Sequence, residues 1–172
     1  LPQIEQFATL SPVPGFMSWL SSQMQDGDTQ LLNEPERFAI TTLAAELSVE
    51  KNLGGLLVFP AWHQNMQIAQ VLKPILLRLC TEYLTGLEPG KLRARDGVAH
   101  FHLSNGATLQ QINWMADISP KGIRQSCGMM VNYLYDPLTI DANSENYVQT
   151  GSIARSSALR KEKVVKHVRS NN

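Results

Sequence analysis

The segment from Arg95 to Tyr135 mixes uncharged polar side chains with large apolar ones, and no other feature constrains the fold as strongly. Its polar members are His100, His102, Asn105, Asn113, Gln125, Ser126 and Asn132. Its large apolar members include Trp114, Met115, Met129 and Met130. Buried polar groups must be hydrogen-bonded, because otherwise they destabilise the fold. The mixture is typical either of an internal hydrogen-bond network or of an apolar pocket with a few placed polar groups, and we expect the pocket.

The composition indicates one domain without a strong overall electric field. With 172 residues, the chain is long enough to enclose a hydrophobic core. Fifteen basic and fifteen acidic side chains balance, which argues against a general affinity for nucleic acid or acidic membranes. No apolar run approaches the roughly 20 residues that cross a bilayer. We therefore expect neither a nucleic-acid partner nor a membrane span.

Terminal and cysteine patterns bear on the compartment. The chain begins with Leu1 and shows no signal-peptide pattern, so we expect a fragment or a processed product. Cys80 and Cys127 fit free thiols in a reducing compartment better than a disulfide-stapled domain. The last residues, 170–172, do not form a peroxisomal signal. A cytoplasmic or mitochondrial location is the resulting expectation.

Near the N-terminus, a strand and a helix are predicted to meet at Ser11. Residues Ile4–Leu10 have the pattern of a short strand, and a helix is expected over Pro14–Met24. Pro12 cannot continue a central strand, so the chain should turn here. Two roles for Ser11 remain open: its hydroxyl caps the following helix, or it points into a cleft, as at strand ends in mixed α/β proteins.

The middle of the chain is predicted to be mainly helical. Residues Gln25–Leu32 are polar and are expected to form a loop. A helix should begin after Asn33 and end near Lys51. Residues Gln64–Thr85 carry an apolar stripe at helical spacing, and Pro74 must either kink this helix or start a new one. The stripe is most simply explained as core.

The second half is predicted to alternate helices and strands. A helix is expected over Asp96–Leu103, with His102 in its last turn, where the helix dipole favours the protonated imidazole. Ala107–Asn113 and Met130–Tyr135 have the composition of strands, and Ser119–Ser126 that of a short helix. His102 titrates near neutral pH, which makes it the candidate proton donor.

Two further features have plain explanations. His100 and His102 are two residues apart, do not share a helix face, and have no third ligand nearby, so no metal site is predicted. The basic residues Lys91, Arg93 and Arg95 could meet an anionic ligand, but a solvated loop is the simpler explanation. In the same way, Trp62-His63 could reach the site, although a surface position is the simpler expectation.

The C-terminal segment 155–172 carries six basic residues and one acidic residue. Its net charge is +5, and the rest of the chain carries −5. Apolar positions such as Leu159, Val164 and Val168 predict a terminal helix. Such a charge run is usually a solvated face, and a role against an anionic partner stays open.

Four peptides in order resemble the malonyl-CoA decarboxylase family. They are FATLSPVPGFMSWL (Phe7–Leu20), FHLSNGA (Phe101–Ala107), INWMADISPKGI (Ile112–Ile123) and SCGMMVNYLY (Ser126–Tyr135). The resemblance implies an α+β fold: the C-terminal portion of a GCN5-related N-acetyltransferase-like domain, with a mixed sheet flanked by helices. Residues 1–154 would form the C-terminal part of the catalytic domain, and 155–172 a basic tail. The family's all-helical domain and the first part of its catalytic domain would lie outside this chain.

The resemblance also implies the site. The family's catalytic serine lies in the LSPxPGF motif, which places it at Ser11. Its histidine lies in the FHLxNGA motif, at His102, and a site tyrosine lies in the NYxY motif, at Tyr135. Ser11 and His102 would also bind the substrate.

The implied reaction converts malonyl-CoA to acetyl-CoA and carbon dioxide without a metal or an organic cofactor. Ser11 and His102 would handle the proton and stabilise the enolate. A homo-oligomer is also implied. Two other classes remain open: an acetyl-CoA-dependent N-acetyltransferase, which would need an amine acceptor, and a non-catalytic acyl-CoA-binding module, which would form no product.

Overall fold

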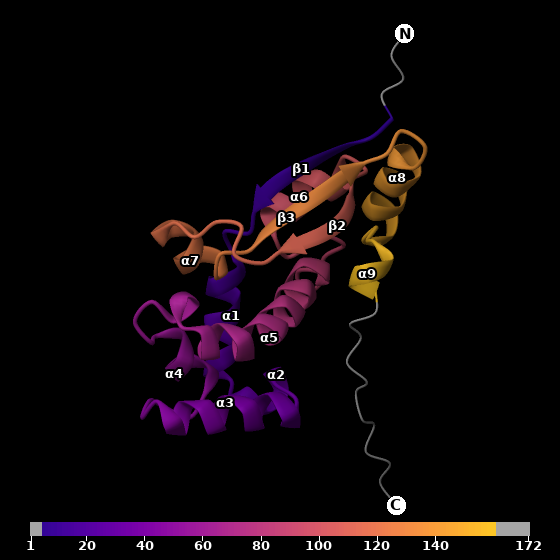
Figure 1. Cartoon of the computed structure of the whole chain (residues 1–172). Coiled ribbons are helices and arrows are strands. Elements are labelled where there is room, and N and C mark those ends of the chain that lie inside the picture. The colour runs from indigo at the N-terminus through magenta and orange to yellow at the C-terminus, as the bar shows by residue number, and fades with distance from the viewer. Residues whose placement is uncertain (1–4, 161–172) are drawn as a thin grey trace, which may run out of the picture.

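The computed structural model describes residues 5–160, and its three strands form one antiparallel sheet, which lies above the helices of residues 16–85 in the view of Figure 1. The strands are β1 (Phe7–Pro12), β2 (Thr108–Asn113) and β3 (Met130–Tyr135), in the order β1-β3-β2. The central strand β3 is thus the last in sequence, and it pairs with a strand from the opposite end of the chain. Segments more than a hundred residues apart meet in this way.

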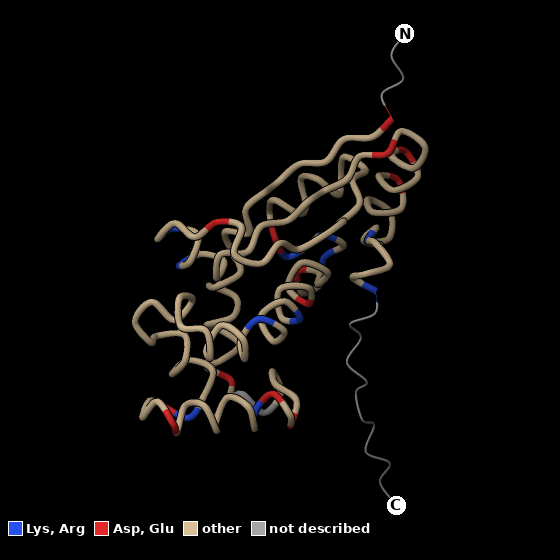
Figure 2. Tube along the Cα trace, viewed as in Figure 1, with Lys and Arg blue, Asp and Glu red and all other residues tan. Residues whose placement is uncertain are grey.

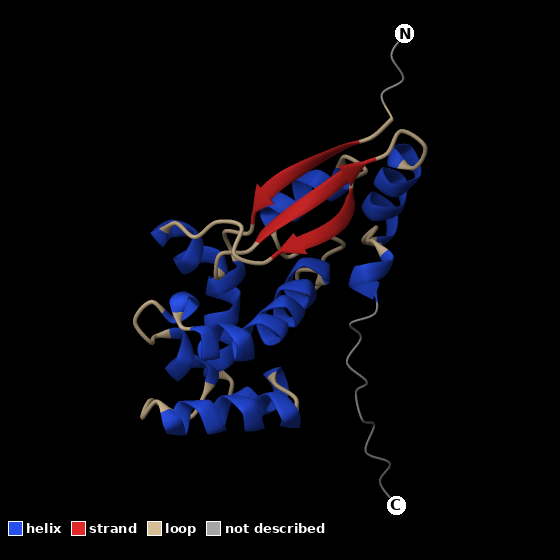
Figure 3. Cartoon of the chain, in the orientation of Figure 1, coloured by secondary structure: helices blue, strands red, loops and turns tan. Residues whose placement is uncertain are grey.

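Helices make up most of the rest of the described chain (Figure 3). They are α1 (Phe16–Gln25), α2 (Asp28–Leu31), α3 (Glu34–Glu46), α4 (Leu53–Leu57), the 3₁₀ helix η1 (Trp62–Gln64), α5 (Met66–Thr85), α6 (Gly97–Ser104), α7 (Pro120–Ser126), α8 (Ile140–Thr150) and α9 (Ser157–Arg160). The predicted α+β class, with helices flanking a sheet, is confirmed. Among residues 5–160, no helix is long and apolar enough to cross a bilayer.

One face of the sheet is buried. Alternate residues of β3, namely Val131, Tyr133 and Tyr135, are buried, as the period of two in a strand requires. In β1, Ser11 lies opposite Val131, and in β2 the buried Ile112 lies opposite the same residue. Helix α6 lies behind this face in Figure 1. Side chains from β1, β3 and α6 therefore share one interior.

Local capping explains where several helices begin. Asn33 and Glu36 form a reciprocal capping box at the start of α3, and Ser119 caps α7. Helix α3 ends at Glu46, earlier than predicted, because the chain then turns into α4, whose own cap is Asn52. Helix α5 runs through Pro74 without a new helix beginning there.

Three other predictions need correction. The expected N-terminal strand is shifted toward the C-terminus: β1 includes Ser11 and Pro12, which is possible because β1 is an edge strand. The expected loop Gln25–Leu32 contains the short helix α2. Helix α8 was not predicted, since its sequence IDANSENYVQT buries only Tyr147 and lacks an apolar stripe.

The end of the described chain runs beside β2. The N–H of Leu109 donates to the carbonyl of Ala154 at 2.8 Å, and the N–H of Ser156 donates back to Leu109 at 3.0 Å. The predicted terminal helix appears as α9 over Ser157–Arg160, whereas Val164 and Val168 lie outside the described residues.

Candidate functional site

Two hydroxyl groups hold the imidazole of His102, one at each ring nitrogen. The Oγ of Ser11 lies 3.1 Å from Nε2, and the Oη of Tyr135 lies 2.8 Å from Nδ1. Ser11, His102 and Tyr135 are 6%, 8% and 9% exposed, respectively, so the cluster is nearly closed to water but still reaches the surface. The structure thus brings together the three residues singled out in the sequence.

Ser11 takes its position from the edge strand rather than from the helix that follows. It lies on the buried face of β1, opposite Val131. Gly15 is the N-cap residue of α1, and no side chain caps that helix. The capping role considered for Ser11 is therefore wrong, because its hydroxyl is turned to His102 instead.

His102 takes its position from a buried carboxylate at the start of α6. Asp96 is 1% exposed, and its Oδ1 accepts the N–H of Ala99 at 2.8 Å. Its Oδ2 accepts the hydroxyl of Tyr83, on α5, at 3.0 Å. Burial and the Asp96 carboxylate raise the pKa of Tyr83, so this hydroxyl remains a donor. Asp96 therefore caps α6 and ties it to α5, which fixes the helix that carries His102.

Aromatic rings fix the plane of the imidazole. The ring of Tyr133 stacks on His102 with centroids 4.2 Å apart and an interplanar angle of 17°. Tyr135, which bonds to Nδ1, is in turn stacked on Phe7 at 4.7 Å. The hydroxyl of Tyr133 is buried and has no hydrogen-bond partner among the described residues. Tyr133 thus contacts the site through its ring alone.

The electrostatics differ from the sequence-based expectation in sign. Burial lowers the pKa of His102, because a charged imidazolium loses more hydration than the neutral ring. Desolvation thus opposes the protonated form that the helix dipole was expected to favour. Burial also raises the pKa of Tyr135, which keeps its hydroxyl protonated. Figure 2 shows the three strands free of charged residues, so none lies beside the imidazole in the sheet.

A neutral imidazole suits this setting. It has one N–H donor and one acceptor nitrogen, and a hydroxyl can serve as partner to either. In this form, Ser11, His102 and Tyr135 make a hydrogen-bonded chain of neutral groups along which a proton can be passed. Such a group can give and regain a proton during general acid–base catalysis.

The other polar residues of the segment Arg95–Tyr135 do not surround one cleft. His100 bonds through Nδ1 to the hydroxyl of Tyr147 at 2.7 Å. The amide of Asn113 donates to that of Asn132 at 2.7 Å, and Ser126 donates to backbone carbonyls. The predicted single pocket is wrong for this set, because most members belong to separate internal networks.

The remaining candidates lie elsewhere. His63 lines a separate hollow of about 430 Å³ together with Met17 and Cys127, and so does not join the site. In the basic loop, Lys91 and Arg93 pair with Glu88, and the guanidinium of Arg95 lies over the ring of Trp19 at 5.3 Å. These basic side chains therefore have partners within the chain.

The two cysteines are free and buried. Burial raises the pKa of both thiols, that of Cys127 to about 12, so neither resembles a reactive thiolate. No group of three or more potential metal ligands occurs among the described residues.

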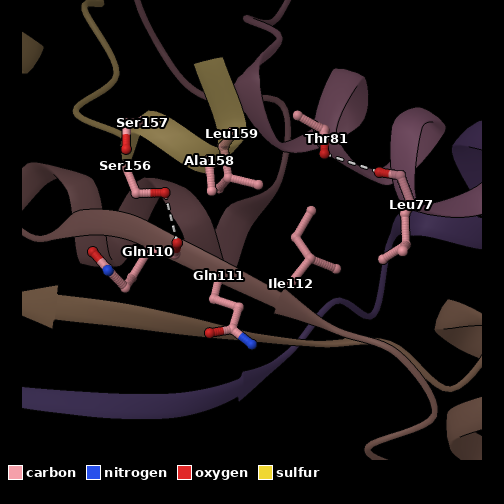
Figure 4. A pocket seen from close by; sticks show the side chains of 9 residues that line it. All are labelled: Leu77, Thr81, Gln110, Gln111, Ile112, Ser156, Ser157, Ala158 and Leu159. Atoms are coloured by element: carbon pink, nitrogen blue, oxygen red, sulfur yellow. Dashed lines mark hydrogen bonds between the residues drawn. The ribbon is translucent and has the colours of Figure 1, made fainter. Parts of the chain in front are cut away.

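A further hollow, of about 340 Å³, lies between α5, β2 and α9 (Figure 4). Its lining residues are Leu77, Thr81, Gln110, Gln111, Ile112, Ser156, Ser157, Ala158 and Leu159. The hydroxyls of Thr81 and Ser156 are bonded to backbone carbonyls of Leu77 and Gln110, respectively. None of the three clustered residues lines it.

The family model and the similar proteins all indicate the same family. The model for the malonyl-CoA decarboxylase C-terminal domain matches residues 1–172. The mitochondrial malonyl-CoA decarboxylase of the goose Anser anser anser is 44% identical over 161 residues, which cover 91% of this chain and 32% of that protein. The rat protein of the same name is 38% identical over 163 residues, covering 92% and 33%. The chain spans about a third of the length of these relatives.

Solved structures agree in fold. A malonyl-CoA decarboxylase from Rhodopseudomonas palustris matches with a TM-score of 0.77 and 41% identity, over 94% of this chain and 36% of that one. One from Cupriavidus metallidurans matches with a TM-score of 0.71 and 33% identity, over 94% and 39%.

Proposed function

The chain belongs to the malonyl-CoA decarboxylase family, and we propose that it carries proton-handling residues of an enzyme that converts malonyl-CoA to acetyl-CoA and carbon dioxide. One observation supports this most: His102 lies between the hydroxyls of Ser11 and Tyr135, each within 3.1 Å of a ring nitrogen. Residues from three separate motifs thus form one hydrogen-bonded chain. This arrangement suits a reaction whose main demand on the protein is to place a proton.

The chemistry requires one proton. The bond between the α-carbon and the carboxylate breaks, and its electron pair passes into the thioester as an enolate while carbon dioxide leaves. A proton then bonds to the α-carbon and gives acetyl-CoA. The thioester is itself the electron sink, so we propose that no metal or organic cofactor takes part. Fixed donors near the enolate oxygen would stabilise the developing charge, each by about 3 kcal/mol.

The three residues have distinct proposed roles. His102, neutral in its buried setting, supplies a proton from Nε2 through the hydroxyl of Ser11. Tyr135 orients the ring through Nδ1, and a proton from solvent water replaces the one delivered to the α-carbon before the next turnover. Ser11 also binds the substrate beside His102. A covalent acyl-serine is not needed, because no acyl group is transferred.

Membership of this family also supports proposals about the domain, the oligomeric state and the location of the protein. We propose that the sheet is the C-terminal portion of a GCN5-related N-acetyltransferase-like domain, with 1–154 as catalytic part and 155–172 as basic tail. The protein would act on malonyl-CoA as a homo-oligomer. A mitochondrial location follows the names of the relatives, and a cytoplasmic one is compatible with the same residues.

The test uses the natural full-length protein that carries this sequence. We expect acetyl-CoA and carbon dioxide from malonyl-CoA without added amine. His102→Asn should lower kcat by about 10²-fold or more with little change in KM, since it removes the proton donor. His100→Asn is the matched control, because His100 lies on the same helix but bonds to Tyr147.

The outcomes separate the alternatives. Wild-type turnover in His102→Asn would remove His102 from the mechanism. Product that forms only with an added amine would indicate an acetyltransferase. Acyl-CoA binding without any product would indicate a binding module. Thermal unfolding of both variants shows whether a loss of activity reflects a loss of fold.

A further inference from the structure

We propose that Thr9 is a positioning residue of the site: its hydroxyl accepts the proton of Ser11 and thereby keeps Nε2 of His102 protonated. The inference rests on the proposed function for its effect on catalysis. Its structural part concerns only the direction of hydrogen bonds and can be measured separately. It adds a fourth member to the cluster of Ser11, His102 and Tyr135.

The geometry places Thr9 at the end of that cluster. Its Oγ1 lies 3.1 Å from the Oγ of Ser11. The two residues are two positions apart on β1, so their side chains share one face of the sheet. Thr9 lies opposite Tyr133, the residue whose ring stacks on His102. The hydroxyls of Thr9, Ser11 and Tyr135 and the imidazole thus form one line of hydrogen-bonding groups.

The direction of this line follows from counting protons. A phenol hydroxyl is a better donor than acceptor, and burial keeps that of Tyr135 protonated, so it donates to Nδ1. A neutral imidazole that accepts at Nδ1 must carry its proton at Nε2, and this proton is donated to Ser11. While no substrate is bound to take it, the single proton of Ser11 then needs another acceptor. Thr9 is the acceptor within reach.

The backbone of Thr9 is held in place. Its carbonyl accepts the side-chain amide of Asn132 at 3.0 Å, and Asn132 in turn accepts the amide of Asn113 at 2.7 Å. These bonds join β1 to β3 and β2 through side chains, beyond the ladder of backbone bonds. As a β-branched residue, Thr9 also has few side-chain rotamers. Its hydroxyl is therefore restricted in position before any substrate binds.

Loss of the Thr9 hydroxyl should allow the donor–acceptor direction of these hydrogen bonds to reverse. Ser11 and Tyr135 would then compete to donate to the imidazole. Where Ser11 donates to Nε2, the ring carries its proton on Nδ1 and the hydroxyl of Tyr135 accepts it. In that form, the nitrogen facing Ser11 has no proton to give. The proposed reaction would be slowed although all three other residues remain in place.

The experiment compares Thr9→Val, which keeps the shape but removes the hydroxyl, with Thr9→Ser, which keeps the hydroxyl. Imidazole ¹⁵N NMR of the full-length protein that carries this sequence reports which nitrogen of His102 carries the proton. We expect the Nε2–H form in the wild type and in Thr9→Ser, and a shift to the Nδ1–H form in Thr9→Val. In the full-length protein, kcat of Thr9→Val should fall roughly 10-fold with KM unchanged, and Thr9→Ser should retain activity.

Each result decides one point. Wild-type ¹⁵N shifts in Thr9→Val, or a wild-type Nδ1–H form, would overturn the role of Thr9. Equal kcat values in an active enzyme would overturn its effect on catalysis. A wild-type protein without decarboxylase activity would instead contradict the proposed function and leave the NMR comparison as the test of Thr9. Thermal unfolding of both variants, expected to be similar, controls for the fold.

Discussion

Replacement of Asp96 should test how strongly the structure holds the helix of His102. Asp96→Ala removes the N-cap bond to Ala99, which is worth about 1 kcal/mol. It also leaves the buried hydroxyl of Tyr83 without its partner, at a cost of about 1–3 kcal/mol. The free energy of unfolding should therefore fall by about 2–4 kcal/mol.

Two matched variants separate these contributions. Asn33→Ala removes a cap bond of the same kind at the start of α3, where the bond is exposed, and should cost only about 1 kcal/mol. Asp96→Asn keeps an oxygen for the cap, but its amide group cannot accept the hydroxyl of Tyr83, so its cost should fall between the two. Tyr83→Phe completes a double-mutant cycle with Asp96→Ala.

The assay is urea unfolding of the 172-residue chain, followed by circular dichroism. The reasoning would be refuted if Asp96→Ala lowered the free energy of unfolding by no more than Asn33→Ala does. In that case, the bond to Tyr83 would contribute nothing to stability. A double-mutant cycle with no coupling between Asp96 and Tyr83 would also refute it. The imidazole ¹⁵N shifts of His102 in Asp96→Asn show whether the loss also disturbs the site.

Two further predictions concern the imidazole and its neighbour. Tyr133→Phe should not lower the free energy of unfolding, because the removed hydroxyl is buried without a partner among the described residues. Tyr133→Leu should lower it by about 1 kcal/mol or more, because the stack on His102 is lost. Equal urea midpoints for the two variants would contradict this prediction. Burial lowers the pKa of His102 in the folded state, so the unfolded chain binds a proton first as the pH falls. The contribution of His102 to the free energy of unfolding should be fully present above the unfolded pKa of about 6.5 and should be lost progressively below it. Urea titrations at pH 7 and pH 5.5 should therefore show a smaller loss of stability in His102→Asn than in the wild type. An equal loss in both proteins would contradict this prediction.

Elements that depend on neighbouring residues were predictable. The caps at Asn33 and Ser119, and the cap of α6 by Asp96, follow from side chains that bond to backbone groups three residues away. Strands β2 and β3 follow from their alternation and composition. Helix α8 was missed because its sequence has no apolar stripe, and its place depends on contacts such as that between Tyr147 and His100.

The candidate site was predictable as a set of residues but not as a geometry. The motifs named Ser11, His102 and Tyr135, and their catalytic roles stay predictions. Thr9 was missed, although a hydroxyl two positions before Ser11 on a predicted strand is a signal that could have found it. Tyr133 was missed because its contribution is a ring stack, which no local pattern indicates.

By itself, the sequence determined most helices and strands, although not α2, α8 or the bounds of β1, and it determined which family the chain resembles, because capping, periodicity and motif order act over a few residues. Only the tertiary structure decided that Ser11 meets His102 across 91 positions of the chain, and that burial lowers the pKa of the imidazole. The first depends on how β1 and α6 pack together, and the second on how much water that packing excludes. Desolvation is a property of the packed interior, so no local pattern in the sequence contains it.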